Sequence, residues 1–179
     1  MGSLRGRVGG EVLGNTIECE LAGSSIVGRF GGGVIGKDLN LTWDQTAGKL
    51  EGRYGGAIAG KDIVAFVDRD HLKGRVGGTI EGANLDLQMV GKTIVRGRIG
   101  GNIFGFSANL EVAARVSDTG MASGNIRGRM GGGLFGHDLL LAVDDFPLLV
   151  GVALAAAVYF EWRRSNRGSG GGSHGSSNS

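Results

Sequence analysis

One unit repeats six times along this chain of 179 residues, and it constrains the fold more than any other feature. The copies read LRGRVGGEVLGNTIECEL from Leu4, IVGRFGGGVIGKDLNLTW from Ile26, LEGRYGGAIAGKDIVAFV from Leu50, LKGRVGGTIEGANLDLQM from Leu72, VRGRIGGNIFGFSANLEV from Val95 and IRGRMGGGLFGHDLLLAV from Ile126. They share the pattern h-x-G-R-h-G-G-x-h-x-G-x-x-h-x-h-x-h, in which h is apolar, and they begin 22 to 31 residues apart. A period of this length indicates an array of identical supersecondary units.

Two copies also contain the skeleton of a phosphate-binding loop, GGGVIGKD at 31–38 and GGAIAGKD at 55–62. In such a loop, glycine amides cradle phosphates and the lysine reaches the terminal ones. The four other copies replace Lys37 and Lys61 by Asn15, Ala83, Phe106 and His137. Aspartate follows each lysine, where Ser or Thr would hold magnesium, and the next run alternates like a strand rather than a helix. We therefore expect no nucleotide and no cofactor, and we assign the glycines to the fold.

Apolar residues alternate with polar ones in each copy, which is the period-2 signature of a β-strand. In the first copy the alternation runs from Leu4 to Gly14, and a second alternating run follows a short break. The break has the Gly-x-Asp/Asn chemistry of a turn, at Asn15-Thr16, Lys37-Asp38, Ala83-Asn84 and His137-Asp138. Each copy is thus predicted to be a β-hairpin. The inward columns would be Val8, Phe30, Tyr54, Val76, Ile99 and Met130, with Ile17, Leu39, Ile63, Leu85 and Leu139.

Six hairpins can form either a closed barrel or, if Gly9-Gly10 is itself a turn, a parallel β-solenoid of three short strands per coil. Stacked coils would place the arginine of every repeat about 4.8 Å from the next, where like charges repel. A meander separates them by about 10 Å, and closure removes exposed sheet edges. We therefore predict an all-β closed barrel of about twelve antiparallel strands over residues 1–145, with the solenoid as the alternative.

The chain after the last copy is apolar, with fifteen uncharged residues from Phe146 to Phe160. Asp144 is suited to a helix N-cap and Pro147 to a first turn, so a helix is expected over 146–162, followed by a disordered Gly/Ser-rich tail over 163–179. A membrane span is one reading, although fifteen residues cover only about 22 Å. The other reading places this narrow helix inside the barrel, whose lumen must be filled. Inward glycines would then let the wall approach it closely, at Gly6, Gly28, Gly52, Gly74, Gly97 and Gly128.

Six hairpins and a closing stretch LLLAVDDFPLLVGVALAAAVYFEW resemble the group formed by the Tubby C-terminal domain, phospholipid scramblase and LURP-one proteins. The resemblance covers residues 4–162 and implies a twelve-stranded barrel around a central apolar helix. It also implies a membrane-associated or lipid-binding role. The regular repeat and its glycines are similar to the symmetric β-flower barrels as well.

Charge and residue chemistry exclude several functions. Removing Glu161 and three tail arginines from the 17 acidic and 19 basic residues leaves 16 of each sign, so the barrel is a poor partner for nucleic acid. The single Cys19 cannot form an internal disulfide and is expected in the core. The three histidines lack ligand spacing, which argues against a metal site. No catalytic constellation recurs in the copies, so we predict that the protein is not an enzyme.

The candidate site is a belt of repeat arginines on the outer face, Arg7, Arg29, Arg53, Arg75, Arg98 and Arg129. It would bind anionic headgroups of membrane lipid, unless these side chains pair with acids such as Glu18, Glu20, Asp86 and Glu111. We therefore expect a monomeric, non-enzymatic barrel associated with lipid or a membrane surface, with no known protein partner. The start MGSLRGRVGG lacks the apolar region of a signal peptide, so a cytoplasmic location is expected. The alternatives are a single-pass membrane-anchored scaffold or interaction domain, and a self-assembling structural solenoid.

Overall fold

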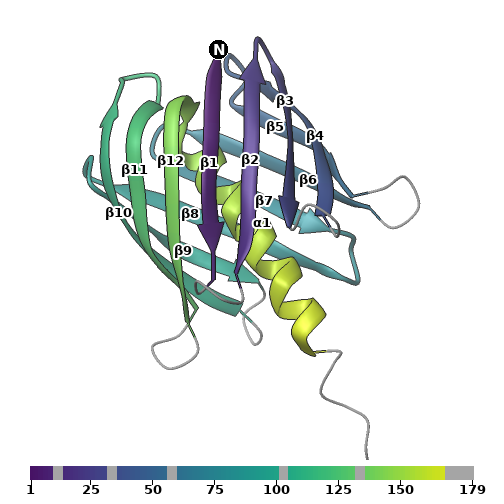
Figure 1. Ribbon diagram of the computed structural model, residues 1–179. Coiled ribbons are helices and arrows are strands. Elements are labelled where there is room, and N and C mark those ends of the chain that lie inside the picture. Colours follow the sequence, from purple (N-terminus) through teal and green to yellow (C-terminus); the bar gives the residue numbers. More distant parts are fainter. Residues whose placement is uncertain (10–13, 32–35, 56–59, 101–104, 132–135, 168–179) are drawn as a thin grey trace, which may run out of the picture.

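A single closed sheet forms the wall of the protein in its computed structural model, which describes residues 1–9, 14–31, 36–55, 60–100, 105–131 and 136–167. The elements are β1 (Gly2–Val8), β2 (Asn15–Ala22), β3 (Ser25–Gly31), β4 (Gly36–Asp44), β5 (Lys49–Tyr54), β6 (Lys61–Asp68), β7 (His71–Gly77), β8 (Gly82–Val90), β9 (Ile94–Gly100), β10 (Gly105–Val116), β11 (Met121–Met130), β12 (His137–Pro147) and α1 (Leu148–Arg167). Each strand pairs antiparallel with its neighbours in the chain, and β1 pairs with β12 (Figure 1). The predicted twelve-stranded barrel is confirmed, and the parallel solenoid is wrong.

The inward face of the wall is the one that the repeat predicts. In β8, for example, Ala83, Leu85, Leu87 and Met89 are buried while the residues between them are exposed. Every member of the two predicted columns is buried, from Val8 to Met130 and from Ile17 to Leu139. Cys19 is 2 % exposed in this core, and burial, followed by the charge of Glu18, raises the pKa of its thiol to about 12. The alternation therefore fixes which face of each strand is apolar.

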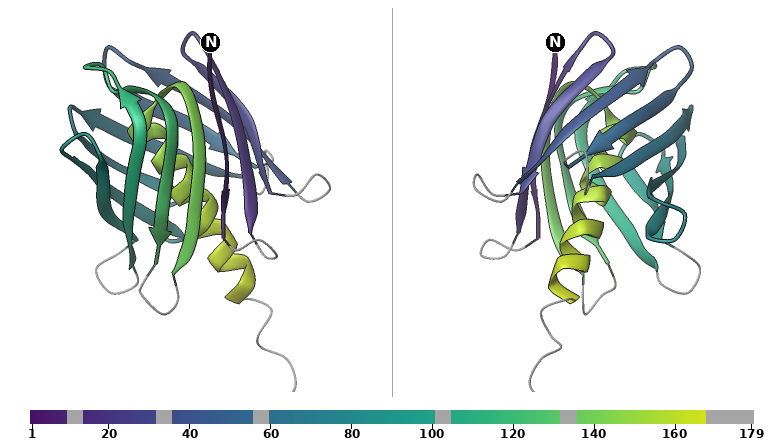
Figure 2. Two further views of the ribbon diagram at one scale, coloured as in Figure 1. Left: turned by 60° about the vertical axis from the view of Figure 1, so that its left-hand side comes forward. Right: turned by 90° about the vertical axis from the view of Figure 1, so that its right-hand side faces the viewer.

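Helix α1 fills the lumen. Its residues from Leu148 to Tyr159 are all buried, and a narrow middle section of Gly151, Ala153, Ala155, Ala156 and Ala157 lets it fit between the walls. Figures 1 and 2 show α1 running through the barrel, from the end where the chain begins to the opposite end. The buried reading of the helix is therefore confirmed. Within the described residues, no helix has the length and apolar character required to span a membrane.

The two ends of the barrel differ. We call the end with the tight turns after β2, β4, β6, β8 and β10 the turn end, and helix α1 begins there. The other end, where the two strands of each repeat are joined and α1 leaves the barrel, is called the exit end (Figure 2). Helix α1 thus leads from the turn end to the exit end.

The predicted helix boundaries shift. Strand β12 continues to Pro147, so α1 begins two residues after the expected Phe146 and extends to Arg167, beyond the expected Trp162. Asp144 is not the N-cap, because it still belongs to β12 and its carboxylate accepts a hydrogen bond from the Ser123 hydroxyl at 2.9 Å. The predicted tail is helical to Arg167, and the rest of it, 168–179, lies outside the described residues.

The predicted turn positions are wrong. Asn15-Thr16, Lys37-Asp38, Ala83-Asn84 and His137-Asp138 lie inside β2, β4, β8 and β12 rather than between strands. The fourth copy shows where the chain reverses, because β7 ends at Gly77 and β8 begins at Gly82. Gly77 has a φ of +84°, a conformation that side-chain-bearing residues rarely adopt, so the strand stops there despite the continuing alternation.

The inward glycines do not serve the helix as expected. A Cβ on Gly97 would lie 2.1 Å from the Asp86 carbonyl oxygen and 2.7 Å from the Leu87 Cα, both on the neighbouring strand β8. The three nearest atoms at Gly6, Gly28, Gly52, Gly74 and Gly128 likewise belong to a neighbouring strand. These glycines therefore allow adjacent strands to lie close together. A larger inward side chain of the neighbouring strand covers the space that each glycine leaves.

This role predicts the effect of a single methyl group. Gly97→Ala should lower the free energy of unfolding by about 1–3 kcal/mol, because the neighbouring backbone must move to accept the methyl. Gly78→Ala is the matched control, since no atom lies within 4 Å of its Cβ position, and it should change stability by less than about 0.5 kcal/mol. Urea unfolding followed by far-UV circular dichroism compares the two. Equal stability of the two variants would contradict the close approach of the strands.

Candidate functional site

One position of the repeat surrounds the helix where it leaves the barrel. This position, the residue after the fourth conserved glycine of the repeat, is called the exit ring and consists of Asn15, Lys37, Lys61, Ala83, Phe106 and His137. Each is the first or second residue of an even-numbered strand, in phase with the inward residues that follow. The copies differ in chemistry at this position, and four of the six side chains contact the last turns of α1.

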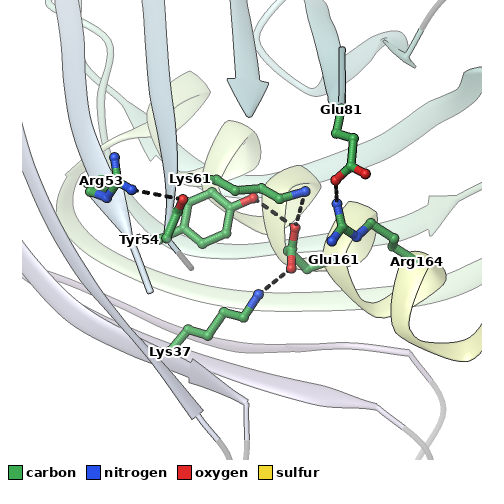
Figure 3. Close-up of polar contacts among 8 residues, drawn as sticks. Lys37, Arg53, Tyr54, Lys61, Glu81, Glu161 and Arg164 are labelled. Atoms are coloured by element: carbon green, nitrogen blue, oxygen red, sulfur yellow. Dashed lines mark hydrogen bonds and ion pairs between the residues drawn. The ribbon is translucent and has the colours of Figure 1, made fainter. Parts of the chain in front are cut away.

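The two lysines of the exit ring hold the only buried charged residue in the described part of the chain. Glu161 of α1 is 5 % exposed and forms ion pairs with Lys37 and, at 3.1 Å, with Lys61 (Figure 3). The Tyr54 hydroxyl donates a hydrogen bond to the same carboxylate at 3.1 Å. The lysines that resemble those of phosphate-binding loops therefore bind a carboxylate of their own chain.

This environment shifts the acidities of the groups in it. Burial alone would raise the pKa of Glu161, but hydrogen bonds and charge from Lys37 and Lys61 outweigh burial, and the pKa is lowered. Burial and the Glu161 charge raise the pKa of Tyr54, which stays a neutral donor. The carboxylate is thus ionised and saturated with donors, so the cluster is suited to fixing the helix rather than to proton transfer.

The opposite side of the same helical turns packs on aromatic rings. Tyr159 meets Phe106 edge to face with ring centroids 4.5 Å apart, and His137 meets Trp162 with centroids 4.2 Å apart. The guanidinium of Arg163 lies 5.6 Å from the centroid of the Phe106 ring. The exit ring therefore orients α1 with charge on one side and aromatic contacts on the other.

The predicted arginine belt lies on the outer face at the exit end. Its guanidinium groups interact with other residues of the same chain. Arg29 pairs with Asp38 at 2.5 Å and Arg53 with Asp62 at 2.8 Å, across adjacent strands. Arg75 donates to Asn84 and to the Gly78 and Thr79 carbonyls, and Arg129 lies 3.8 Å from Asp138 and donates to the Gly136 carbonyl. Arg7 and Arg98 also have interactions.

Three of the four acids expected to serve the belt have other partners. Glu18 pairs with Arg5, Glu111 with Arg127 and Asp86 with His71. The partners of Arg29, Arg53 and Arg129 are instead the aspartates that follow the exit ring, so each of these arginines links the two strands of its own hairpin. The sequence contains a pattern that could have predicted these arginine–aspartate pairs, since an aspartate follows the exit-ring residue in three copies.

A cavity of about 370 Å³ opens at the turn end, beside the first residues of α1. Its apolar wall contains Trp43, Val67, Met89, Val116, Pro147, Leu148, Leu149 and Val150, and its polar groups are Gln45, Arg69, Asp70, Lys92, Ser117, Asp118 and Thr119. The amides of Trp43, Val67 and Met89 each donate a 2.7 Å hydrogen bond to a carbonyl of a neighbouring hairpin turn. These hydrogen bonds tie the ends of β4, β6 and β8 to the neighbouring turns beside the cavity.

Two residues of the cavity are in unfavourable states. The indole N–H of Trp43, a side chain 6 % exposed, has no acceptor among the described residues, and such a group costs about 1–3 kcal/mol. Arg69 has a φ of +51°, although Gly23, Gly48, Gly91 and Gly120 supply the left-handed residue in four other turns at this end. Strain of this kind in a side-chain-bearing residue is characteristic of functional sites.

Comparison with protein-family models, with curated proteins and with solved structures finds no match to this chain. The chemistry of the described residues is therefore the basis for a functional assignment. At the exit end, residues of the barrel contact the last turns of α1, whereas the turn end has a preformed cavity beside the first turn of the helix.

The Glu161 cluster predicts a stability change that depends on pH. Glu161→Gln should lower the free energy of unfolding at pH 7 by about 1.5–3 kcal/mol, because charged hydrogen bonds to a buried carboxylate are lost. A carboxyl whose pKa is lowered by folding stabilises the protein above its ordinary pKa of 4.5, and this contribution disappears as the pH falls through the folded value. The difference between wild type and variant should therefore shrink below about pH 4.

Urea unfolding at several pH values measures this difference. Glu51→Gln is the control, since Glu51 pairs with Lys49 at 2.6 Å but is 51 % exposed, and its loss should cost less than about 1 kcal/mol. A Glu161→Gln effect no larger than that of the control, or one that does not depend on pH, would contradict the role of the buried carboxylate.

Proposed function

We propose that this protein is a non-enzymatic barrel that binds a small amphipathic, lipid-like molecule in the turn-end cavity. The observation that carries the proposal is the cavity itself, about 370 Å³ with an apolar wall and polar residues at its rim. Small-molecule sites occupy about 300–1,000 Å³, are mostly apolar with a few polar groups, and often lie in the mouths of barrels. An amphipathic molecule would place its tail against Met89 and Leu149 and its polar head near the rim.

The remainder of the molecule supports a binding role. Helix α1 and the inward side chains fill the lumen, so the ligand would bind beside the helix start rather than along the barrel axis. The resemblance to the Tubby-like group, which would imply lipid binding, agrees with this proposal through its architecture of a closed barrel around a C-terminal helix.

Intrinsic fluorescence tests the proposal directly. The chain has two tryptophans, and Trp162→Phe leaves Trp43, a residue of the cavity wall, as the only reporter. Titration with decanoate, 1-decanol and decylammonium should give saturable changes of Trp43 emission for at least one of them. Val67→Phe, which fills the cavity, should abolish the change, whereas Val64→Phe should preserve it because Val64 of the same strand faces outward and is 41 % exposed.

No saturable change with any of the three amphiphiles would contradict ligand binding in the cavity. Equal loss of binding in Val67→Phe and Val64→Phe would contradict its location there. Circular dichroism of both variants confirms that they are folded, so that a loss of binding is not mistaken for a loss of structure.

A second candidate function is association with a membrane surface through the exit end. Ile80, in the connection between β7 and β8, is 96 % exposed, and Arg75 holds this connection through the Gly78 and Thr79 carbonyls. Arg164 of α1 pairs with the adjacent Glu81. The sequence has an apolar residue at the Ile80 position in every copy, and the other five lie outside the described residues.

Flotation with vesicles of phosphatidylcholine and phosphatidylserine at low salt tests this second function. Ile80→Ser should weaken vesicle binding by about tenfold or more, because an inserted isoleucine contributes about 1.5–3 kcal/mol. Val64→Ser is the control on the outer wall, away from the exit end. Binding that is absent, or that both substitutions leave unchanged, would remove the proposal that the exit end contacts membranes.

A further inference from the structure

We infer that one insertion in the repeat, residues 113–125, is the specificity-determining element of the turn-end cavity and covers the apolar tail of the bound molecule. These residues form the far end of the β10–β11 hairpin and are called the flap. The inference rests on the proposed cavity function and assigns ligand recognition to a defined segment of the chain.

The flap is a departure from the repeat. Between the last apolar position of one copy and the first of the next, the chain has four to six residues in the first four copies, at 22–25, 44–49, 68–71 and 90–94. The same connection after the fifth copy has 13 residues, 113–125. Short connections are sufficient to join antiparallel strands, so the turn itself does not require the additional residues.

The flap extends beyond the closed wall. Pairing of β10 with β9 ends at Glu111, opposite Ile94, and in the described sheet residues 113–116 of β10 pair with β11 alone. Strand β10 accordingly has 12 residues, against seven in β9. The ring is closed without the flap, because residues 126–130 of β11 pair with both β10 and β12. Barrel closure therefore does not explain why the flap is present.

A bulge lies at the base of the flap. The register of β11 with β12 shifts between Ala122 and Gly124, and a β-bulge bends its strand. The Ser123 hydroxyl donates a hydrogen bond to the Asp144 carboxylate and accepts one from the Asp145 amide, both at 2.9 Å. The bend of the flap is thus held by the strand that leads into α1.

The flap also contacts the core and the helix start. Its inward residues Ala114 and Val116 pack against the hydrophobic core. At its tip, the Gly120 carbonyl accepts a 3.0 Å hydrogen bond from the amide of Leu148, the first residue of α1. The flap is therefore a preformed cover beside the helix start.

The cavity lies between the flap and the regular part of the turn end. Residues 116–120 of the flap line it, together with Leu149 of α1 and with Trp43, Val67 and Met89. The last three occupy the final apolar position of their copies, a position that all six copies share. The flap, by contrast, occurs once in the sequence. The single insertion thus accounts for a cavity at one place on a nearly symmetric barrel end.

Val116 is the flap residue suited to contact an apolar tail. Met89 is 8 % exposed and Leu149 is 5 % exposed, so both wall residues keep some apolar surface uncovered. Val116 is partly buried in the same lining, while Ser117 and Thr119 at the tip are exposed. A tail between Val116 and the wall would lose contact with water on both sides, which favours binding.

The first test shortens the flap in the full-length protein. Residues 113–125 are replaced by a copy of 44–49, the connection after the second repeat. The shortened protein should keep the far-UV circular dichroism of the barrel. Its affinity for decanoate, 1-decanol and decylammonium, measured by isothermal titration calorimetry below micelle formation, should fall at least about tenfold, because the tail is exposed to water on one side.

A matched pair of substitutions tests the flap at single residues. Val116→Asp places a carboxylate in the apolar lining, and it should lower the affinity for the amphiphile that wild type binds most tightly by at least about tenfold. Ala113→Asp makes the same charge change at an exposed residue of the same strand that does not line the cavity. It should leave the affinity within about twofold.

Hydrogen exchange gives a readout that a purely structural role of the flap would not change. A saturating concentration of the same amphiphile should slow amide exchange in residues 113–125, because the flap opens less often when a tail lies beneath it. Exchange in β3, which does not line the cavity, should stay the same.

The outcomes separate the two proposals. If the shortened protein is folded and binds as tightly as wild type, or if calorimetric binding leaves exchange of the flap unchanged, the flap inference fails and the cavity function stands. If the shortened protein does not fold, Val116→Asp and Ala113→Asp decide, and equal affinities of these two variants overturn the inference. If no amphiphile binds the intact protein, the proposed cavity function fails and the flap inference fails with it.

Discussion

The lumen of a closed twelve-stranded sheet is too wide for its own side chains to fill, and the whole structure depends on the helix that fills it. The repeats supply an apolar wall, but a wall of this size without α1 would enclose water or collapse. Glycine and alanine in the middle of α1 keep it narrow, and large residues at Phe146 and Tyr159 fill the space near its two ends. Barrel and helix therefore stabilise each other, which explains why the apolar C-terminal segment is buried in protein.

A symmetric barrel offers the helix six equivalent orientations about its axis, and the differences among the copies select one. Lys37 and Lys61 bind Glu161, while Phe106 and His137 receive the aromatic residues of the same helical turns. Rotating the helix by one repeat would place Glu161 between Lys61 and Ala83 or between Asn15 and Lys37. Either move would remove one of its two lysine partners, and a buried carboxylate with fewer partners is unfavourable. Shared positions thus form the wall, and the divergent position determines how the helix sits in it.

The sequence predicted the strands and their buried faces, which depend on local periodicity. It did not predict contacts between residues that are distant in the chain. The alternation identified the inward columns and the twelve strands, because burial on one face leaves a period in the chain, and the uncharged run from Phe146 to Phe160 identified the helix. It placed the turns wrongly, since the alternation continues through Gly77 and only the backbone angle shows that the strand has ended. The partnership of Lys37 with Glu161 joins residues 124 positions apart, so no local pattern could reveal it. The cavity depends on where α1 begins relative to the turns, and the shift of that start from Phe146 to Leu148 was not readable from composition.

Both ends of the barrel contain buried polar groups without a hydrogen-bond partner among the described residues, but the ends differ in what surrounds those groups. At the exit end the Tyr159 hydroxyl lacks a partner, while the buried carboxylate of Glu161 is surrounded by Lys37, Lys61 and Tyr54. At the turn end the Trp43 indole N–H lacks an acceptor, and Arg69 occupies a backbone conformation that four other turns give to glycine. Such features lower the stability of a folded protein. Only the turn end also has the cavity of about 370 Å³ beside the start of α1, so a molecule bound there would add contacts to a part of the wall that the helix leaves uncovered.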